Sequence, residues 1–98
     1  MCIRDSGSTF GGGPLVTAVA AAVIEAILRE GLIENAARVG ERLRAGLLRL
    51  AAEGAPIAEV RGRGLMLGVV LTPPVAQQLV GTALRGGLLI NATGARCV

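Results

Sequence analysis

Two adjacent hydroxyl residues, Ser8 and Thr9, lie in a glycine-rich stretch that leads from Gly7 directly into an apolar segment beginning at Pro14. Glycines let the backbone turn where a Cβ atom would clash, and they let amide groups come close to a ligand. Pro14 suits the first position of a helix, because its φ angle is fixed near the helical value and its missing N–H would have no partner there. Hydroxyls, loop amides and the positive end of a helix dipole together form a site suited to a phosphate group.

The same stretch also fits a plain helix start, in which Ser8 or Thr9 caps the helix and the glycines act as a flexible leader. Spacing alone favours this simpler interpretation, because glycine-rich turns are common between structured segments. The stretch is not a P-loop, since no lysine follows its last glycine.

The basic residues restrict the chemistry available within these 98 residues. All ten are arginine, and neither lysine nor histidine is present. Covalent chemistry on a lysine is therefore excluded, and so is the usual general base near neutral pH. Cys2 and Cys97 alone cannot complete a zinc site of normal ligand number. We therefore predict no catalytic and no metal-binding residue here, and two widely separated cysteines indicate a reduced, cytoplasmic protein.

Charge and hydropathy narrow the class of partner. The net charge is only +3, arginines alternate with glutamates, and one residue is aromatic, so nucleic acid is not an expected partner. The apolar run Pro14–Ile24 is too short to span a membrane, and the longer run 64–84 is broken by Pro73 and Pro74. The hydrophobic content of 52% exceeds what a small core needs, which predicts apolar surface for a protein partner.

Two helices should follow the glycine-rich stretch. The first is predicted over Pro14–Glu30 with Gly31 just past its end, and its nearly uniform apolar character predicts that its first turns are buried. The second is predicted over Leu32–Glu53. Its apolar stripe consists of Ala36, Gly40, Leu43, Leu47 and Leu50.

Strands are predicted over Ile57–Arg61 and Leu65–Leu71, split by Gly62-Arg63-Gly64, and the second is apolar enough to be a central strand. Arg61 and Arg63 could bind an anion, although a basic turn facing solvent is the simpler interpretation. A third helix should begin at Thr72 as its cap and end at Arg85. A short strand over Leu88–Asn91 and the beginning of another near Val98 complete the pattern. The fold class is therefore α+β: two long helices and then a β-β-α-β layer, truncated at the C-terminus.

Four motifs in a fixed order give the chain a family resemblance. They are Gly7-Ser8-Thr9-Phe10-Gly11-Gly12 with Pro14-Leu15, Glu30-Gly31-Leu32, Val60-Arg61-Gly62-Arg63-Gly64-Leu65-Met66-Leu67-Gly68, and Gly87-Leu88-Leu89-Ile90-Asn91. This order resembles the C-terminal part of the class III pyridoxal-phosphate aminotransferases, and most closely those that act on N-acetylornithine in the arginine pathway. The resemblance covers Gly7 to Val98 and is more specific for the class than for the substrate.

The resemblance implies a piece of an α/β fold-type-I transferase that binds pyridoxal 5′-phosphate. Residues 1–6 stay unassigned and are interpretable as a non-native leader. Residues 7–31 would form the cofactor-phosphate loop and the long helix leaving the large domain, and residues 32–98 part of the C-terminal small domain. Family members are homodimers in which the hydroxyls matching Ser8 and Thr9 bind the phosphate of the cofactor held by the other subunit. The role that the resemblance implies for Ser8 and Thr9 agrees with the phosphate site suggested by the residue types of the loop. This agreement favours the phosphate interpretation over a plain helix start.

The resemblance also implies the reaction: an amino group passes from N-acetylornithine to 2-oxoglutarate, so the substrates would be small amino acids and 2-oxo acids. The family's Schiff-base lysine lies upstream of this segment, and its carboxylate-binding arginine would lie beyond Val98. We therefore expect the 98 residues alone to be inactive. The family usually has asparagine where Gly13 stands, and often histidine where Ser6 stands.

Two alternatives remain open from the sequence. The amino donor of a related class III enzyme could instead be ornithine, 4-aminobutyrate or succinyl-diaminopimelate. The chain could also be a non-enzymatic helical interaction module, in which the glycine-rich stretch is only a linker.

Overall fold

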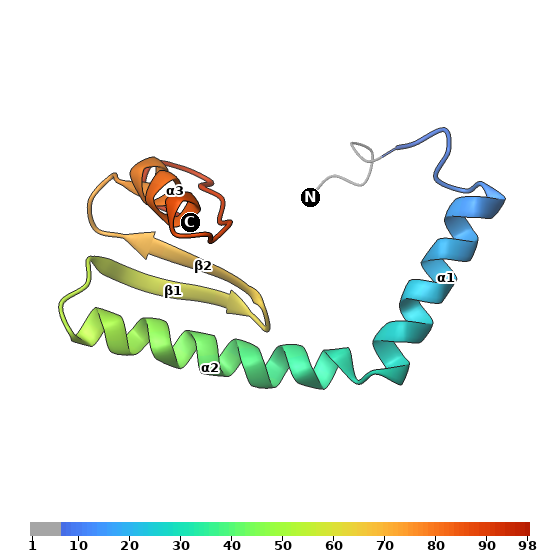
Figure 1. Ribbon diagram of the computed structural model, residues 1–98, viewed down its shortest axis with the longest axis horizontal. Helices are drawn as coiled ribbons and strands as arrows, with labels where there is room; N and C mark the ends of the chain where they lie inside the picture. Colours follow the sequence, from blue (N-terminus) through green and yellow to red (C-terminus); the bar gives the residue numbers. More distant parts are fainter. Residues whose placement is uncertain (1–6) are drawn as a thin grey trace. The chain divides into compact units, whose positions relative to one another are not determined.

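The computed structural model describes residues 7–98, so the unassigned leader and Cys2 lie outside the described residues. The elements follow in the order α1 (Pro14–Arg29), α2 (Leu32–Ala52), β1 (Ile57–Arg63), β2 (Met66–Leu71) and α3 (Ala76–Arg85) (Figure 1). This mixture of helices and antiparallel strands confirms the expected fold class. The chain divides into two units, one up to Glu34 and one from Asn35 onward, which are described separately.

The first unit is built on α1. Pro14 occupies its first turn and Gly31, with a φ angle of 62°, follows its last turn, as the sequence predicts. The prediction that its first turns are buried is wrong for this chain. No residue of α1 is buried, and Leu15 is 77% exposed. The cause is that residues 7–34 contain no other complete element that could cover an apolar helix.

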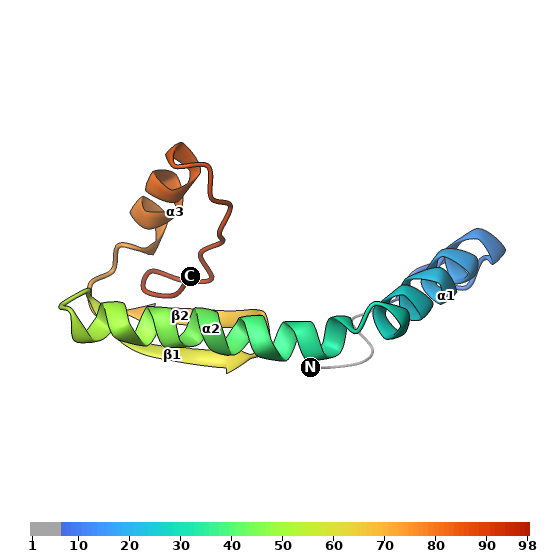
Figure 2. The same cartoon turned by 60° about the horizontal axis from the view of Figure 1, so that its bottom comes forward.

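The second unit contains an antiparallel hairpin formed by β1 and β2 (Figures 1 and 2). Arg63 pairs with Met66 across a two-residue turn, and Gly64 at the first turn position has a φ angle of 57°. Glycine is the residue that this position favours in tight hairpins. Pairing is shifted by one residue near Ala58, which is a β-bulge. The predicted pair of strands is therefore confirmed, with β1 extending two residues further than expected.

Helix α2 meets this hairpin at a contact between two glycines. Gly40 is the buried residue of α2, and a Cβ atom placed on it would collide with the backbone carbonyl of Gly64 and lie 2.8 Å from the Gly64 Cα. On the other side, a Cβ atom on Gly64 would touch Ala36 at ordinary contact distance. The absence of side chains at Gly40 and Gly64 therefore allows the helix and the turn to approach closely.

Residues 96–98 pair with the free edge of β2. The Leu71 amide donates to the Arg96 carbonyl at 2.6 Å, the Val69 amide donates to the Val98 carbonyl at 2.7 Å, and Val70 bridges Cys97. Strand β2 thus lies between β1 and these residues, as its apolar sequence predicts. The expected strand over Leu88–Asn91 is not formed.

Hydrogen bonds of Thr72, Ala76 and Leu88 explain where α3 begins and why no strand follows it at once. The expected cap Thr72 lies before the helix, and its amide and hydroxyl both donate to the Pro56 carbonyl, at 3.0 and 3.4 Å. Helix α3 therefore begins at Ala76, whose amide donates to the Ala95 carbonyl at 3.0 Å. After α3, the Leu88 amide donates to the Ala83 carbonyl at 2.8 Å, so it closes the helix end instead of joining a sheet.

A glycine pair in the hairpin gives a direct test of this geometry. We expect Gly62→Ala to destabilise the unit by about 1–3 kcal/mol, because Gly62 has a φ angle of 124° and a Cβ atom there would lie 2.9 Å from the Leu67 Cα. Gly68→Ala is the matched control on β2, since its nearest contact would be 3.7 Å, and it should change stability by no more than about 0.5 kcal/mol. Urea denaturation measures both values. Equal effects of the two variants would contradict the described register.

Candidate functional site

The glycine-rich segment before α1 folds as two overlapping turns. The Gly11 amide donates to the Ser8 carbonyl at 3.3 Å, and the Gly13 amide donates to the Phe10 carbonyl at 3.4 Å. Gly13 is then the N-cap residue of α1, and its carbonyl accepts the first helical hydrogen bond, from the Thr17 amide at 3.0 Å. The turns bring Ser8 and Thr9 to within one short loop of the helix N-terminus.

Ser8 and Thr9 do not cap α1. No side chain makes a capping hydrogen bond at Gly13, and within residues 7–98 neither hydroxyl takes part in a hydrogen bond. The hydroxyl that does lie near this helix end belongs to Thr17, and it donates back to the Gly13 carbonyl at 3.0 Å. The expectation that Ser8 or Thr9 caps the helix is therefore wrong. Both residues are exposed.

The donors at this end of α1 have the chemistry that an anion requires. Pro14 has no N–H, and the amides of Leu15 and Val16 precede the first intrahelical hydrogen bond, so they have no partner within the helix. No acidic residue lies in the first turn. Two exposed hydroxyls and the positive end of the helix dipole therefore face no nearby carboxylate in this turn, and the segment fits a phosphate group.

The arginines of the hairpin are exposed to solvent. Arg61 Nη2 lies 3.8 Å from Glu59 Oε2, with both side chains about 60% exposed. Arg63 is also exposed. A surface ion pair of this kind contributes little to stability. The structure thus supports the interpretation of these two residues as a basic, solvent-facing part of β1.

The part of the chain that the structure describes contains no group of three or more residues able to hold a metal ion. No helix within residues 7–98 has the length and hydropathy needed to cross a bilayer.

Comparison with known proteins decides which family uses this segment. The family model for class-III aminotransferases matches residues 1–98. The chain belongs to the class-III aminotransferases. Members of this family depend on pyridoxal phosphate. Membership favours an enzyme over the helical interaction module that the sequence left open.

Individual class-III aminotransferases show how much of the enzyme is present. The chain is 51% identical over 92 residues to acetylornithine aminotransferase 1 of Bordetella pertussis, covering 94% of this chain and 23% of that protein. It is 47% identical over 87 residues to acetylornithine aminotransferase of Streptomyces coelicolor, covering 88% of this chain and 21% of that protein. The chain therefore spans a little under a quarter of the length of these relatives.

A solved class-III aminotransferase has the same fold over this segment. The structure of ornithine aminotransferase from Toxoplasma gondii, which contains pyridoxal phosphate at partial occupancy in its active site, superposes with a TM-score of 0.82. The superposition covers 98% of this chain and 23% of that one, at 33% sequence identity. The arrangement of helices and strands is thus that of a fragment of the aminotransferase fold.

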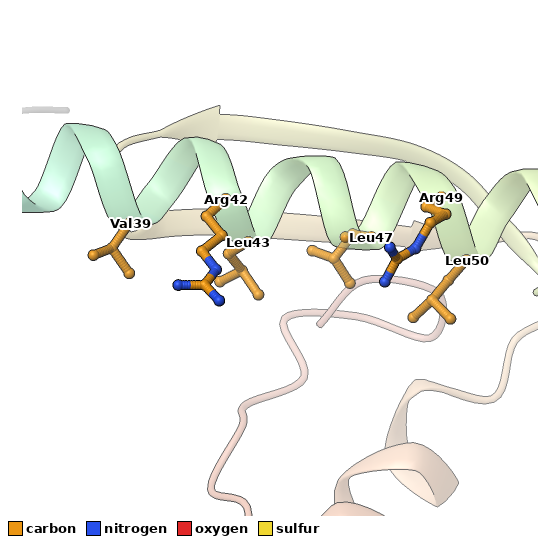
Figure 3. Close-up of a pocket in the computed structure, with 7 residues that line it drawn as sticks. Val39, Arg42, Leu43, Leu47, Arg49 and Leu50 are labelled. Atoms are coloured by element: carbon orange, nitrogen blue, oxygen red, sulfur yellow. The ribbon is translucent and has the colours of Figure 1, made fainter.

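One feature of this class-III aminotransferase segment was not recognised from its sequence. A shallow, open groove runs along α2 and is lined by residues of that helix alone (Figure 3): Val39, Arg42, Leu43, Gly46, Leu47, Arg49 and Leu50. The sequence placed part of this set on the same apolar stripe as Gly40. In the structure, Gly40 and the leucines differ in burial. Gly40 is buried against the hairpin turn, whereas Leu43 and Leu50 are each 48% exposed. Arg42 and Arg49, which flank these leucines, are the sequence feature that could have indicated this face of α2.

Proposed function

We propose that the complete polypeptide containing this segment is a pyridoxal-phosphate-dependent aminotransferase that transfers the amino group of N-acetylornithine to 2-oxoglutarate in arginine biosynthesis. It acts as a cytoplasmic homodimer. The observation that carries the proposal is the 51% identity to acetylornithine aminotransferase 1 of Bordetella pertussis across nearly the whole segment. The 33% identity to ornithine aminotransferase of Toxoplasma gondii supports ornithine as the second candidate donor.

In this proposal, Ser8 and Thr9 hold the phosphate of the cofactor bound by the partner subunit. Their exposure, their position one loop before α1 and the lack of a carboxylate in the first turn support this role. When bound, pyridoxal phosphate supplies an electron sink for the carbon that carries the amino group. The residues of this chain position the cofactor: the two hydroxyls donate hydrogen bonds to its phosphate, and the amides of Leu15 and Val16 add the positive end of the helix dipole.

The segment contributes two parts to the proposed enzyme. Residues 7–31 carry the phosphate loop and the helix that leaves the large domain, and residues 32–98 form part of the small domain that closes on the substrate. No role is assigned to residues 1–6. The lysine that bonds to the cofactor and the arginine that binds the substrate carboxylate belong to other parts of the polypeptide.

An amino-donor assay of the complete polypeptide tests the proposed reaction. With 2-oxoglutarate as acceptor, kcat/KM is compared for N-acetylornithine, ornithine, 4-aminobutyrate and succinyl-diaminopimelate. The proposal expects the highest value for N-acetylornithine. A higher value for ornithine would establish the second candidate instead.

A reduction experiment tests the role assigned to this segment alone. We expect the 98-residue chain, mixed with pyridoxal phosphate and treated with borohydride, to acquire no cofactor on any side chain, because it contains no lysine. Peptide mass spectrometry locates any adduct. The N-terminal amine can also react with the cofactor, so an adduct at that amine shows that the reduction worked. Adduct formation on a side chain would show that this segment supplies a covalent cofactor ligand.

A further inference from the structure

The loop that carries Ser8 and Thr9 has few interactions of its own that fix its shape. Four of the residues 7–13 are glycine, which leaves the backbone more conformations than any other residue. The two backbone hydrogen bonds within the loop are long, at 3.3 and 3.4 Å, compared with the usual length of about 2.9–3.0 Å. The position of the two hydroxyls therefore depends on how firmly the loop is held to α1.

Gly13 is the residue at which this loop joins α1. Its amide donates to the Phe10 carbonyl inside the loop, and its carbonyl accepts the first helical hydrogen bond, from the Thr17 amide. In many helices a capping side chain fixes the entry of the chain into the helix. Gly13 has no side chain, and no other side chain among residues 7–98 makes a capping hydrogen bond at this position. Contacts of the Gly13 backbone therefore set how the loop enters α1.

The Thr17 hydroxyl holds the Gly13 carbonyl from within the helix. It donates to the Gly13 carbonyl at 3.0 Å and to the Pro14 carbonyl at 3.1 Å, so its one hydrogen is shared between them. Within residues 7–34, the side-chain hydrogen bonds in the structure are these two. Both acceptors lie where the loop meets the helix. The hydroxyl thus ties the last residue of the loop to the first turn of α1.

We infer that Thr17 is a positioning residue for the cofactor phosphate. Its hydroxyl holds Gly13, and through Gly13 it keeps Ser8 and Thr9 at the place from which they bind the phosphate. The inference rests on the proposed function, which assigns the phosphate to these two hydroxyls. Thr17 does not itself donate to the phosphate, because its single hydroxyl hydrogen is already engaged by two backbone carbonyls. It acts through the loop.

The position of the acceptor distinguishes Thr17 from other helical threonines. A threonine hydroxyl often donates to the carbonyl four residues earlier in its own helix, without any functional role. Thr82 makes this bond to the Gln78 carbonyl at 3.0 Å, and both residues lie inside α3. Thr17 makes a bond of the same length, but its acceptor Gly13 precedes α1 and belongs to the loop. Thr82 therefore offers the same hydrogen bond without an attached loop.

Cofactor titration of the complete enzyme tests this inference with a matched pair. Thr17→Val keeps the branched shape of the side chain and removes the hydroxyl, and Thr82→Val does the same on α3. We expect Thr17→Val to raise the dissociation constant of pyridoxal phosphate about 2- to 10-fold, because one hydrogen bond between neutral groups is lost. Thr82→Val should leave the constant unchanged, and Thr17→Ser, which keeps a hydroxyl, should bind like the unmodified enzyme. An unchanged constant in Thr17→Val would overturn the inference.

Pyridoxal separates positioning of the phosphate from a general structural effect. It has the ring and the aldehyde of the cofactor but no phosphate, so the loop has nothing to bind in it. Thr17→Val should therefore leave the dissociation constant of pyridoxal unchanged while that of pyridoxal phosphate rises. If the affinity for both compounds falls by the same factor, Thr17 supports the fold as a whole, and its role in positioning the phosphate is wrong.

The role of Thr17 and the proposed function fail separately. If Ser8→Ala and Thr9→Ala weaken the binding of pyridoxal phosphate and Thr17→Val does not, the loop keeps its phosphate role and only the inference about Thr17 is overturned. If neither Ser8→Ala nor Thr9→Ala weakens binding, the phosphate role of the loop is overturned, and the role of Thr17 with it. The preferred amino donor does not enter these titrations, so a different donor would overturn the proposed reaction alone.

Discussion

Thr9→Ala in the complete enzyme is expected to weaken pyridoxal phosphate binding by about 10- to 150-fold, because a hydrogen bond to a charged group contributes roughly 1.5–3 kcal/mol. The expectation comes from the exposed hydroxyl of Thr9, one loop before the positive end of α1. Ser8→Ala should have an effect of similar size. The dissociation constant is measured by titrating the cofactor into the apoenzyme and following its absorbance.

A threonine elsewhere in the segment provides the control for Thr9→Ala. The Thr82 hydroxyl is exposed on α3 and donates to the Gln78 carbonyl at 3.0 Å, so Thr82→Ala also removes one hydroxyl from the surface of a helix. Cofactor affinity should not change in this variant. Unchanged affinity in Thr9→Ala and Ser8→Ala as well would remove the phosphate role from this loop.

Gly40→Ala is expected to lower the free energy of unfolding by about 3 kcal/mol, at the upper end of the usual range for overpacking. The atoms that a Cβ would meet belong to the Gly64 backbone, so no flexible side chain can move aside. Either α2 or the hairpin turn must shift. Urea denaturation of the complete enzyme, followed by circular dichroism, measures the loss.

Gly81→Ala is the matched control for Gly40→Ala, because Gly81 also lies inside a helix. The nearest neighbour of a Cβ atom there would be the end of the Arg85 side chain, at 3.8 Å. This variant should gain up to about 1 kcal/mol from the better helix propensity of alanine. We therefore expect the free energy of unfolding to fall in Gly40→Ala and to rise in Gly81→Ala. A loss of the same size in both variants would show that the contact between Gly40 and Gly64 is unimportant.

The sequence predicted those elements whose ends are marked locally. Pro14 and Gly31 delimit α1, and the predicted and observed ends of α1 and α2 differ by one residue. The hairpin was likewise marked by its glycines around Arg63. In each case the signal lies within a few residues of the feature that it predicts.

Two of the errors concern interactions between distant parts of the chain. Thr72 does not cap α3, because it bonds to Pro56, sixteen residues away. The burial expected for α1 requires a covering surface that residues 7–34 do not contain. For the candidate site, the sequence predicted the hydroxyls Ser8 and Thr9, and their contact with the cofactor stays a prediction. The groove on α2 escaped notice because its leucines belong to the same stripe as the buried Gly40.

The pairing of residues 96–98 with β2 has a consequence for the edge of the sheet. Leu71 and Val69 donate their amides to the Arg96 and Val98 carbonyls. Without this pairing, one side of Met66–Leu71 would be an open strand edge, in a sequence with no charged residue and no proline. Such an edge is a template on which further strands can add. Residues 96–98 therefore shield β2 from edge-to-edge association with strands of other molecules.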